Sequence, residues 1–129
     1  MPKNYFINEG NRIGGQEPQA LGAEQVKITA LSTVTKGQPV DIVESWKVAT
    51  ASADSVKVVG IAANSAREGE TVVVETEGFV KLDADGAISA GDELVSAGNG
   101  KVKKNAGTGT VIGIAFCDAE NDMVYAKLR

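Results

Sequence analysis

The stretch from Val58 to Leu82, VVGIAANSAREGETVVVETEGFVKL, decides the fold, because most of it recurs in altered form nearer the C-terminus. The recurrence runs from Val111 to Leu128 and reads VIGIAFCDAENDMVYAKL. Each copy has an apolar segment, a loop of small residues, an acidic turn and a second apolar segment. Repeats this short cannot bury their apolar faces alone. We therefore expect two similar halves that pack on each other around one core.

The repeat extends further toward the N-terminus. Subtracting residue numbers gives an offset of 54 between Lys27 and Lys81, and the same offset relates four further positions, Val34, Gly37, Val40 and Val48, to Ile88, Gly91, Leu94 and Val102. The offset falls to 53 between Gly60 and Gly113, and to 52 between Val72 and Val124. The changes of offset fall in expected loops, which tolerate insertions and deletions. We infer an internal duplication, with repeats at about 26–78 and 80–129.

Short apolar segments separated by turn residues make up the rest of the region 25–129. Strands are expected at 25–34, 40–44, 56–62, 70–82 with a break at Glu77-Gly78, 93–96, 110–117 and 123–128, with a tight hairpin at Gly98-Asn99-Gly100. The strand at 56–62 is apolar enough to run through the core. The segment Trp46 to Ser55 is expected to be a loop or a single helical turn. Strands of this length and spacing predict an all-β fold, a small barrel or sandwich built from two similar halves.

Residues 1–24 differ in character from the rest. Glycine and polar residues dominate, and the apolar residues gather at Tyr5-Phe6-Ile7 without a strand or helix period. We expect an extended N-terminal arm in front of a β domain at 25–129. Such an arm is either a docking peptide that orders on a partner or a plain disordered terminus.

Composition and charge exclude several classes of protein. The chain of 129 residues has 13 Lys+Arg against 17 Asp+Glu and a net charge of -4, which argues against nucleic-acid binding. A single cysteine, Cys117, excludes an internal disulfide and is expected to be a buried strand thiol. No apolar stretch is long enough to cross a bilayer, and the first residues do not have the pattern of a signal peptide. We expect a soluble protein made in the cytoplasm.

The sequence offers little for catalysis or cofactor binding. The absence of histidine removes Ser-His-Asp arrangements and the commonest transition-metal ligand. The segment Asp83–Gly86 lacks the spacing of a calcium loop, and Gly107–Thr110 precedes an expected strand, whereas a phosphate cradle needs a helix N-terminus. Glu75 and Glu77 are expected to share a solvated strand face. We therefore predict no catalytic, cofactor or metal site.

The order of several short motifs resembles a known family. These motifs are VVGIA at 58–62, EGETVVV at 68–74, Glu77-Gly78, ISAGD at 88–92, IGIA at 112–115 and the final segment 122–128. In this order they resemble the capsid cement or head decoration proteins of tailed bacteriophages. The resemblance covers roughly 26–129 and leaves out the arm.

The resemblance implies a structural role. Proteins of this family are small β-rich domains, commonly trimeric, that sit on the outside of the expanded head at three-fold positions and bridge neighbouring major capsid protein subunits. It implies a virion protein made in the host cytoplasm, without catalysis, cofactor, nucleic-acid or membrane partner, in which several weak contacts act together. We expect the arm to contact capsid or a neighbouring protomer through Tyr5, Phe6, Ile7 and Arg12, and Trp46 to pack over the barrel or at an interface.

Three other classes remain open. A small ligand- or carbohydrate-binding β domain would need a concave aromatic site, and the six aromatic side chains are dispersed along the sequence. An enzyme would need a carboxylate pair with a raised pKa in a barrel mouth. Another structural part of a phage particle, such as a tail component, is the third.

Overall fold

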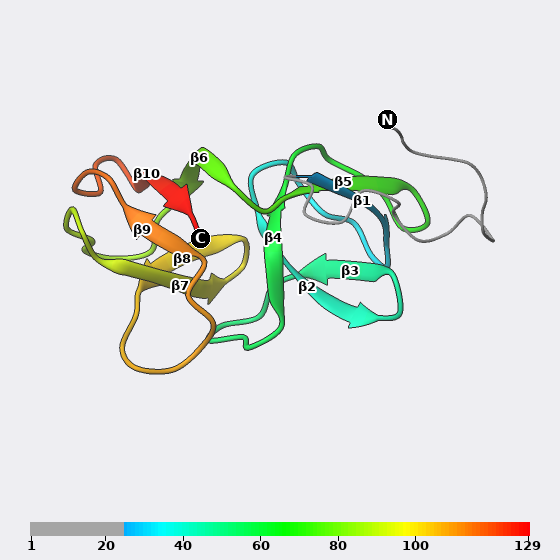
Figure 1. Ribbon diagram of the computed structural model, residues 1–129, viewed down its shortest axis with the longest axis horizontal. Helices are drawn as coiled ribbons and strands as arrows, with labels where there is room; N and C mark the ends of the chain where they lie inside the picture. Colours follow the sequence, from blue (N-terminus) through cyan, green and yellow to red (C-terminus); the bar gives the residue numbers. More distant parts are fainter. Residues whose placement is uncertain (1–24) are drawn as a thin grey trace, which may run out of the picture.

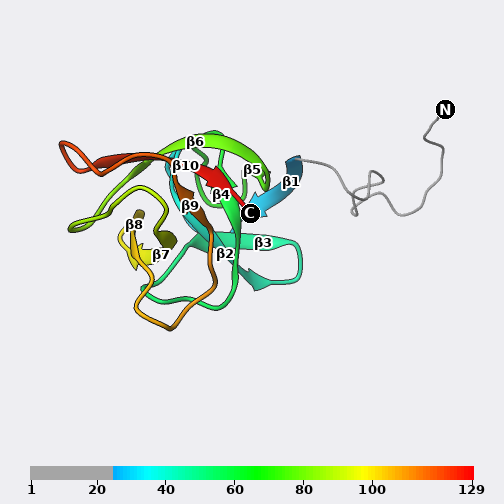
Figure 2. The same ribbon diagram turned by 60° about the vertical axis from the view of Figure 1, so that its left-hand side comes forward.

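The computed structural model describes residues 25–129. In this part of the chain, all helix or strand elements are strands and none is a helix. The strands form two groups of five that lie side by side (Figure 1 and Figure 2). The first group contains β1 Gln25–Ala30, β2 Pro39–Glu44, β3 Lys47–Thr50, β4 Val58–Ala62 and β5 Thr71–Glu75. The second contains β6 Gly78–Asp83, β7 Glu93–Gly98, β8 Lys101–Lys104, β9 Gly113–Ala115 and β10 Met123–Leu128. The predicted all-β class and the two similar halves are confirmed.

Both halves order their strands in the same way. The first half is a closed barrel with the order β1-β3-β2-β4-β5, and the second is a five-stranded sheet with the order β6-β10-β9-β7-β8. Strands β6 to β10 correspond in sequence to β1 to β5, so the second order can be rewritten as β1-β5-β4-β2-β3. This is the order of the first half, followed around the barrel in the opposite direction from β1. The two halves are therefore one topology used twice.

The residue register agrees with the offsets found in the sequence. Val26 of β1 pairs with Val74 of β5, and offsets of 54 and 52 turn this pair into Val80 with Ala126, which pair between β6 and β10. A β-bulge interrupts β2 between Ile42 and Glu44, and one interrupts β7 54 residues later, between Ser96 and Gly98. These equivalent residues thus make equivalent ladder contacts, and the bulge of the β2–β3 ladder recurs in the β7–β8 ladder.

The halves differ in how completely they close. In the first half β1 and β3 pair in parallel through Thr29 with Lys47 and Ala30 with Val48. In the second half only the counterpart of the latter pair is present, as an isolated bridge between Ala84 and Val102. The second half is therefore a five-stranded sheet in which this single bridge stands at the position where the first half closes its barrel.

Each half encloses its own core. Ile28, Val34, Val48 and Val72 belong to one buried cluster, and Leu82, Leu94, Val102 and Val124 belong to the other. The prediction of one shared core is therefore wrong, because each five-stranded unit curls enough to bury its apolar face by itself. Strand β4 is the exception, since its Ile61 belongs to the cluster of the second half and its partly buried Val58 packs against that cluster.

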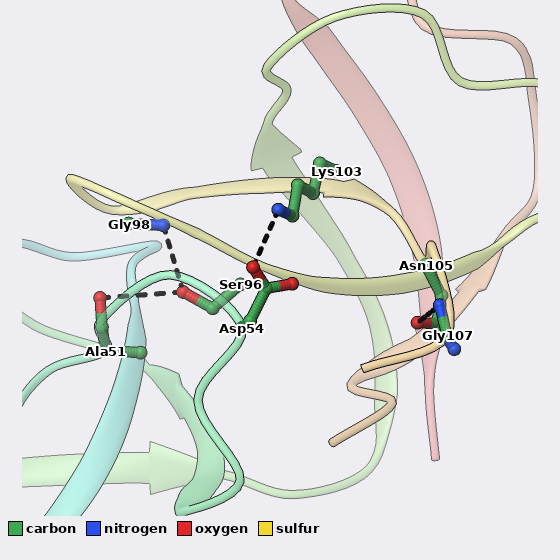
Figure 3. A network of polar contacts seen from close by, with 7 residues as sticks. All are labelled: Ala51, Asp54, Ser96, Gly98, Lys103, Asn105 and Gly107. Atoms are coloured by element: carbon green, nitrogen blue, oxygen red, sulfur yellow. Dashed lines mark hydrogen bonds and ion pairs between the residues drawn. The ribbon is translucent and has the colours of Figure 1, made fainter. Parts of the chain in front are cut away.

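The loop between β3 and β4 fastens the two halves together. The Asp54 amide donates to the Ser96 carbonyl over 2.9 Å, and the Lys103 Nζ lies 3.0 Å from the Asp54 Oδ2 (Figure 3). The Ser96 hydroxyl is placed within 3.5 Å of the Ala51 carbonyl. The hydrogen bond from Lys103 is the main cause that lowers the pKa of Asp54 below its ordinary value. This clamp fixes the first half against β7 and β8.

Three local expectations fail. Lys47–Thr50 forms strand β3, where a loop or helical turn was expected, because its pairing with distant β1 and β2 decides its conformation. In the expected core strand 56–62, Val56 is 73% exposed and Val59 also reaches solvent, so only part of the segment is buried. Cys117 is half-buried and follows β9, and so is not a buried strand thiol.

Candidate interaction surface

Three large aromatic side chains gather on the outer side of the second half. Phe79 and Tyr125 lie on β6 and β10, and Phe116 follows β9; their exposed fractions are 66%, 57% and 58%. In β10 the burial alternates strictly, so Val124, Ala126 and Leu128 enter the core while Tyr125 and Lys127 face outward. We call Phe79, Phe116 and Tyr125 the aromatic face.

Strand pairing brings the aromatic face together. Phe79 pairs with Lys127, two residues beyond Tyr125, and the Phe116 amide donates to the Tyr125 carbonyl over 2.8 Å. The Phe79 and Phe116 rings meet edge to face, with centroids 4.8 Å apart and an interplanar angle of 80°. Exposed apolar side chains that cluster in this way mark interaction sites more often than scattered ones do.

Positive charge borders the aromatic face. Lys81 pairs with Tyr125, and Lys127 pairs with both Phe79 and Ile114, so both lysines project on the same side as the rings. Aromatic side chains with bordering charges are typical of protein interfaces. The arrangement suits a protein partner.

The sequence reasoning missed this surface. It treated the aromatic residues as dispersed, whereas the fold brings three of the six together. Two strands contain a pattern that could have indicated the surface, GFVKL at 78–82 and MVYAKL at 123–128. In each of them an aromatic residue alternates with core residues and therefore faces outward. Their proximity depends on β6 pairing with β10, a contact between distant segments.

Trp46 occupies an unusual backbone position. It lies in the β2–β3 turn with φ of 59°, a left-handed conformation that bulky residues rarely adopt, and is 40% exposed. The counterpart turn of the second half has Gly100 at this position, also with positive φ. The β2–β3 turn is on the side of the first half away from the second (Figure 1), so the fold does not bring Trp46 to the aromatic face.

The remaining predicted site residues have no structural account. Tyr5, Phe6, Ile7 and Arg12 lie outside the described residues 25–129. Their part in capsid binding stays a prediction.

The two carboxylates considered for acid–base chemistry do not lie on one strand. Glu75 ends β5 and Glu77 lies in the connection before β6, so the expected shared strand face is wrong. Residues 25–129 contain no group of three or more Asp, Glu or Cys side chains placed to hold a metal ion. They also contain no helix that is long and apolar enough to span a membrane.

Comparison with solved structures supports the fold. The "head fiber gp8.5 N base" of bacteriophage phi29 matches with a TM-score of 0.65 and 17% sequence identity, over 81% of this chain and 92% of that one. At this identity the match speaks for the architecture alone. A search of curated protein sequences finds no significant match.

Comparison with family models identifies the relationship. The model described as "Phage cement protein" matches residues 21–129, which include both halves and every described strand. This range also contains all the motifs on which the sequence resemblance rests. The chain belongs to the phage cement protein family.

Proposed function

We propose that the protein binds the outside of the expanded phage head as a homotrimer and stabilises the head by bridging major capsid protein subunits. The observation that carries the proposal is the family match over residues 21–129. The fold shared with a phage head fibre base supports the same reading. As a member of this family the chain is a structural protein of the phage head. In this proposal it has no catalytic role and needs no cofactor or nucleic acid.

The physical task of such a protein is mechanical. Packed DNA presses outward on the shell, and a compact domain that contacts several subunits at once resists their separation. Three copies joined in one assembly make three linked contacts, so the second and third contacts form at a high effective concentration. Modest single contacts are then sufficient for stable decoration.

Two surfaces are proposed to contact capsid. The first is the arm at 1–24, with Tyr5, Phe6 and Ile7 as apolar anchors and Arg12 as a charged contact, adding backbone hydrogen bonds to a sheet edge. The second is the β2–β3 turn with Trp46, an exposed aromatic side chain of the kind that dominates binding energy in interfaces. A variant that begins at residue 25 lacks the arm, so its affinity for heads measures the contribution of the β2–β3 turn without that of the arm.

Co-sedimentation with purified heads tests the proposal. The protein is titrated onto undecorated expanded heads and, as control, onto unexpanded shells, and bound copies are counted in the pellet. We expect saturation on expanded heads only, with copies in multiples of three at each local three-fold position. Binding to neither shell would overturn the proposal and direct attention to another part of the particle or to a small ligand.

A further inference from the structure

A buried carboxylate on β2 has one oxygen atom without a hydrogen-bond donor. Val40 and Ile42 on either side of Asp41 pack in the first core, so Asp41 points out of the barrel. The β3–β4 loop lies over it: the Ser52 amide donates to the Asp41 Oδ2 over 3.2 Å, and Asp41 is 7% exposed. The Asp41 Oδ1 accepts no hydrogen bond from the residues that the structure describes. A buried carboxylate oxygen is unfavourable without a donor, so this position calls for a donor from outside residues 25–129.

The second half shows that the fold does not require a charge at this position. The offset of 54 relates Asp41 to Val95, which is 0% exposed. The ladders agree, since Asp41 pairs with Ala49 and Val95 pairs with Lys103, again 54 residues later. An apolar side chain thus suits the same place in the repeat. The charge of Asp41 therefore has another use than holding the strands together.

Asp41 contributes to an open pocket of about 340 Å³ between β2 and the β3–β4 loop. Val43 and Val56 line this pocket with exposed fractions of 48% and 73%. Asp41 is far less exposed than either valine, so its carboxylate lies deep in the pocket and the valines lie near the opening. We call the pocket formed by Asp41, Val43 and residues 52–57 the Asp41 pocket. It offers a ligand apolar walls and an anionic base.

The charge of Asp41 is not compensated within the pocket. Asp54 also lines the pocket, but the Lys103 Nζ lies 3.0 Å from the Asp54 Oδ2 (Figure 3). Lys57 lines the pocket as well, and neither it nor another cationic side chain of the described region forms an ion pair with Asp41. A calcium ion takes about six to eight oxygen ligands, whereas the pocket has two carboxylates, one of them already paired with lysine. The Asp41 pocket therefore fits an organic cation better than a metal ion.

We infer that the Asp41 pocket receives a lysine side chain of a protein partner. The aliphatic stem of lysine packs against Val43 and Val56, and its ammonium donates to the Asp41 Oδ1. Lysine fits better than arginine, because arginine pairs best with both oxygens of a carboxylate and the Ser52 amide already occupies Oδ2. Strand β2 leads from the pocket to the β2–β3 turn with Trp46. The identification of the partner as major capsid protein rests on the proposed function; the preference of the pocket for lysine does not.

NMR titration of the full chain tests the occupant. The probe is the Nα-acetyl amide of lysine, and its control is the norleucine compound, which has an aliphatic stem without the ammonium. We expect saturable shift changes at the Ser52 amide and at the Val43 and Val56 methyl groups with the lysine compound only, and their loss in Asp41→Asn. Absence of these changes, or equal changes with both compounds, would overturn the inference.

Two other occupants have distinct outcomes in the same titration. A response at these positions to calcium chloride but not to the lysine compound would assign the pocket to a metal ion. A response to the lysine compound only in the variant that begins at residue 25 would show that the arm occupies the pocket in the full chain. Either result would contradict the inference.

Co-sedimentation with expanded heads tests the partner. Asp41→Asn keeps an acceptor for the Ser52 amide, and we expect it to weaken head binding about thirtyfold, as loss of one partner of a buried charge pair does. Asp85→Asn removes the same charge from an exposed position and should bind as wild type does. Val56→Lys places a competing ammonium at the pocket opening and should also weaken binding, whereas Val59→Lys adds the same charge outside the pocket and should not.

The two experiments separate this inference from the proposed function. Circular dichroism verifies that each variant is folded. Wild-type affinity of both folded pocket variants, Asp41→Asn and Val56→Lys, would overturn the inferred contact with capsid. If the wild-type protein binds no heads, the proposed function fails, and the NMR titration by itself decides whether the pocket takes lysine.

Discussion

Gly60 and Gly113 are required by the same backbone contact in the two halves. A Cβ at Gly60 would collide with the Glu75 carbonyl oxygen, and one at Gly113 would collide with the Lys127 carbonyl oxygen. Glycine is the residue that permits such a close approach of two strands. The matching glycines in the repeated sequence are therefore explained by packing, in both halves for one reason.

Alanine at either glycine should destabilise the protein. We expect Gly60→Ala and Gly113→Ala each to lower the free energy of unfolding by about 2 kcal/mol, because the strands must move apart. Urea denaturation measures the change. Val59→Ala, in the same strand but partly exposed, serves as control and should stay within about 0.5 kcal/mol of wild type. If both glycine variants had the same free energy of unfolding as wild type, the strands could move apart without loss of stability, which would contradict the prediction.

A substitution at Trp46 should affect binding without a large effect on folding. In Trp46→Gly the backbone gains a residue suited to φ of 59°, while some burial of the indole is lost. These effects oppose each other, so we expect the free energy of unfolding to change by less than about 1 kcal/mol. If the side chain contacts capsid, affinity for expanded heads should fall roughly thirtyfold, the effect of removing an interface hot spot. Trp46→Phe keeps an aromatic ring and is the control; unchanged affinity of the glycine variant would remove Trp46 from the interface.

At the scale of elements, the β3–β4 loop is the part that holds the halves together. Asp54 has φ of 54° and contacts β7 through its amide and β8 through its carboxylate. Gly109 lies against the Asp54 backbone, and the Thr110 amide donates to the Ser55 carbonyl over 2.9 Å. The loop thus contacts several segments of the second half.

The Asp54 pair should make stability depend on acid pH. The pKa of Asp54 is lowered in the folded protein, first through the hydrogen bond from Lys103. The ionised carboxylate therefore stabilises the fold fully at pH values above its ordinary pKa of 3.8. This contribution is lost as pH falls through the lowered folded pKa. We expect Asp54→Asn to be less stable than wild type at pH 7 and to approach it near pH 3 in urea titrations. A stability difference that does not change with pH would contradict this; Asp85→Asn, at an exposed carboxylate without an ion pair in residues 25–129, is the control.

Local patterns predicted most elements, and distant pairing decided the others. The strands at Val58–Ala62 and Met123–Leu128 follow from their apolar residues and flanking turns. Lys47–Thr50 has weak strand character of its own and becomes β3 because β1 and β2 pair with it from either side. The same limit applies to the aromatic face, since no local pattern tells that β6 lies beside β10.

For the whole molecule, the sequence predicted the duplication but not how the two repeats pack together. The offsets between Lys27 and Lys81 and between Gly60 and Gly113 identify equivalent ladder positions. They do not tell whether two units share one core or keep two, because that depends on how far each sheet curls. The structure gives each half its own core, and Val58 and Ile61 of β4 join the first half to the core of the second. A family whose members decorate phage heads is well served by such a unit, since a two-part block can present several surfaces at once.

The stability of DNA-filled heads with and without the protein tests directly whether it stabilises the head. Heads lacking it are saturated with wild-type protein, heated in steps, and assayed for DNA that has become accessible to nuclease. We expect decorated heads to keep their DNA to a higher temperature, in proportion to the sites occupied. Saturated heads that release their DNA at the same temperature as bare heads would contradict a stabilising role.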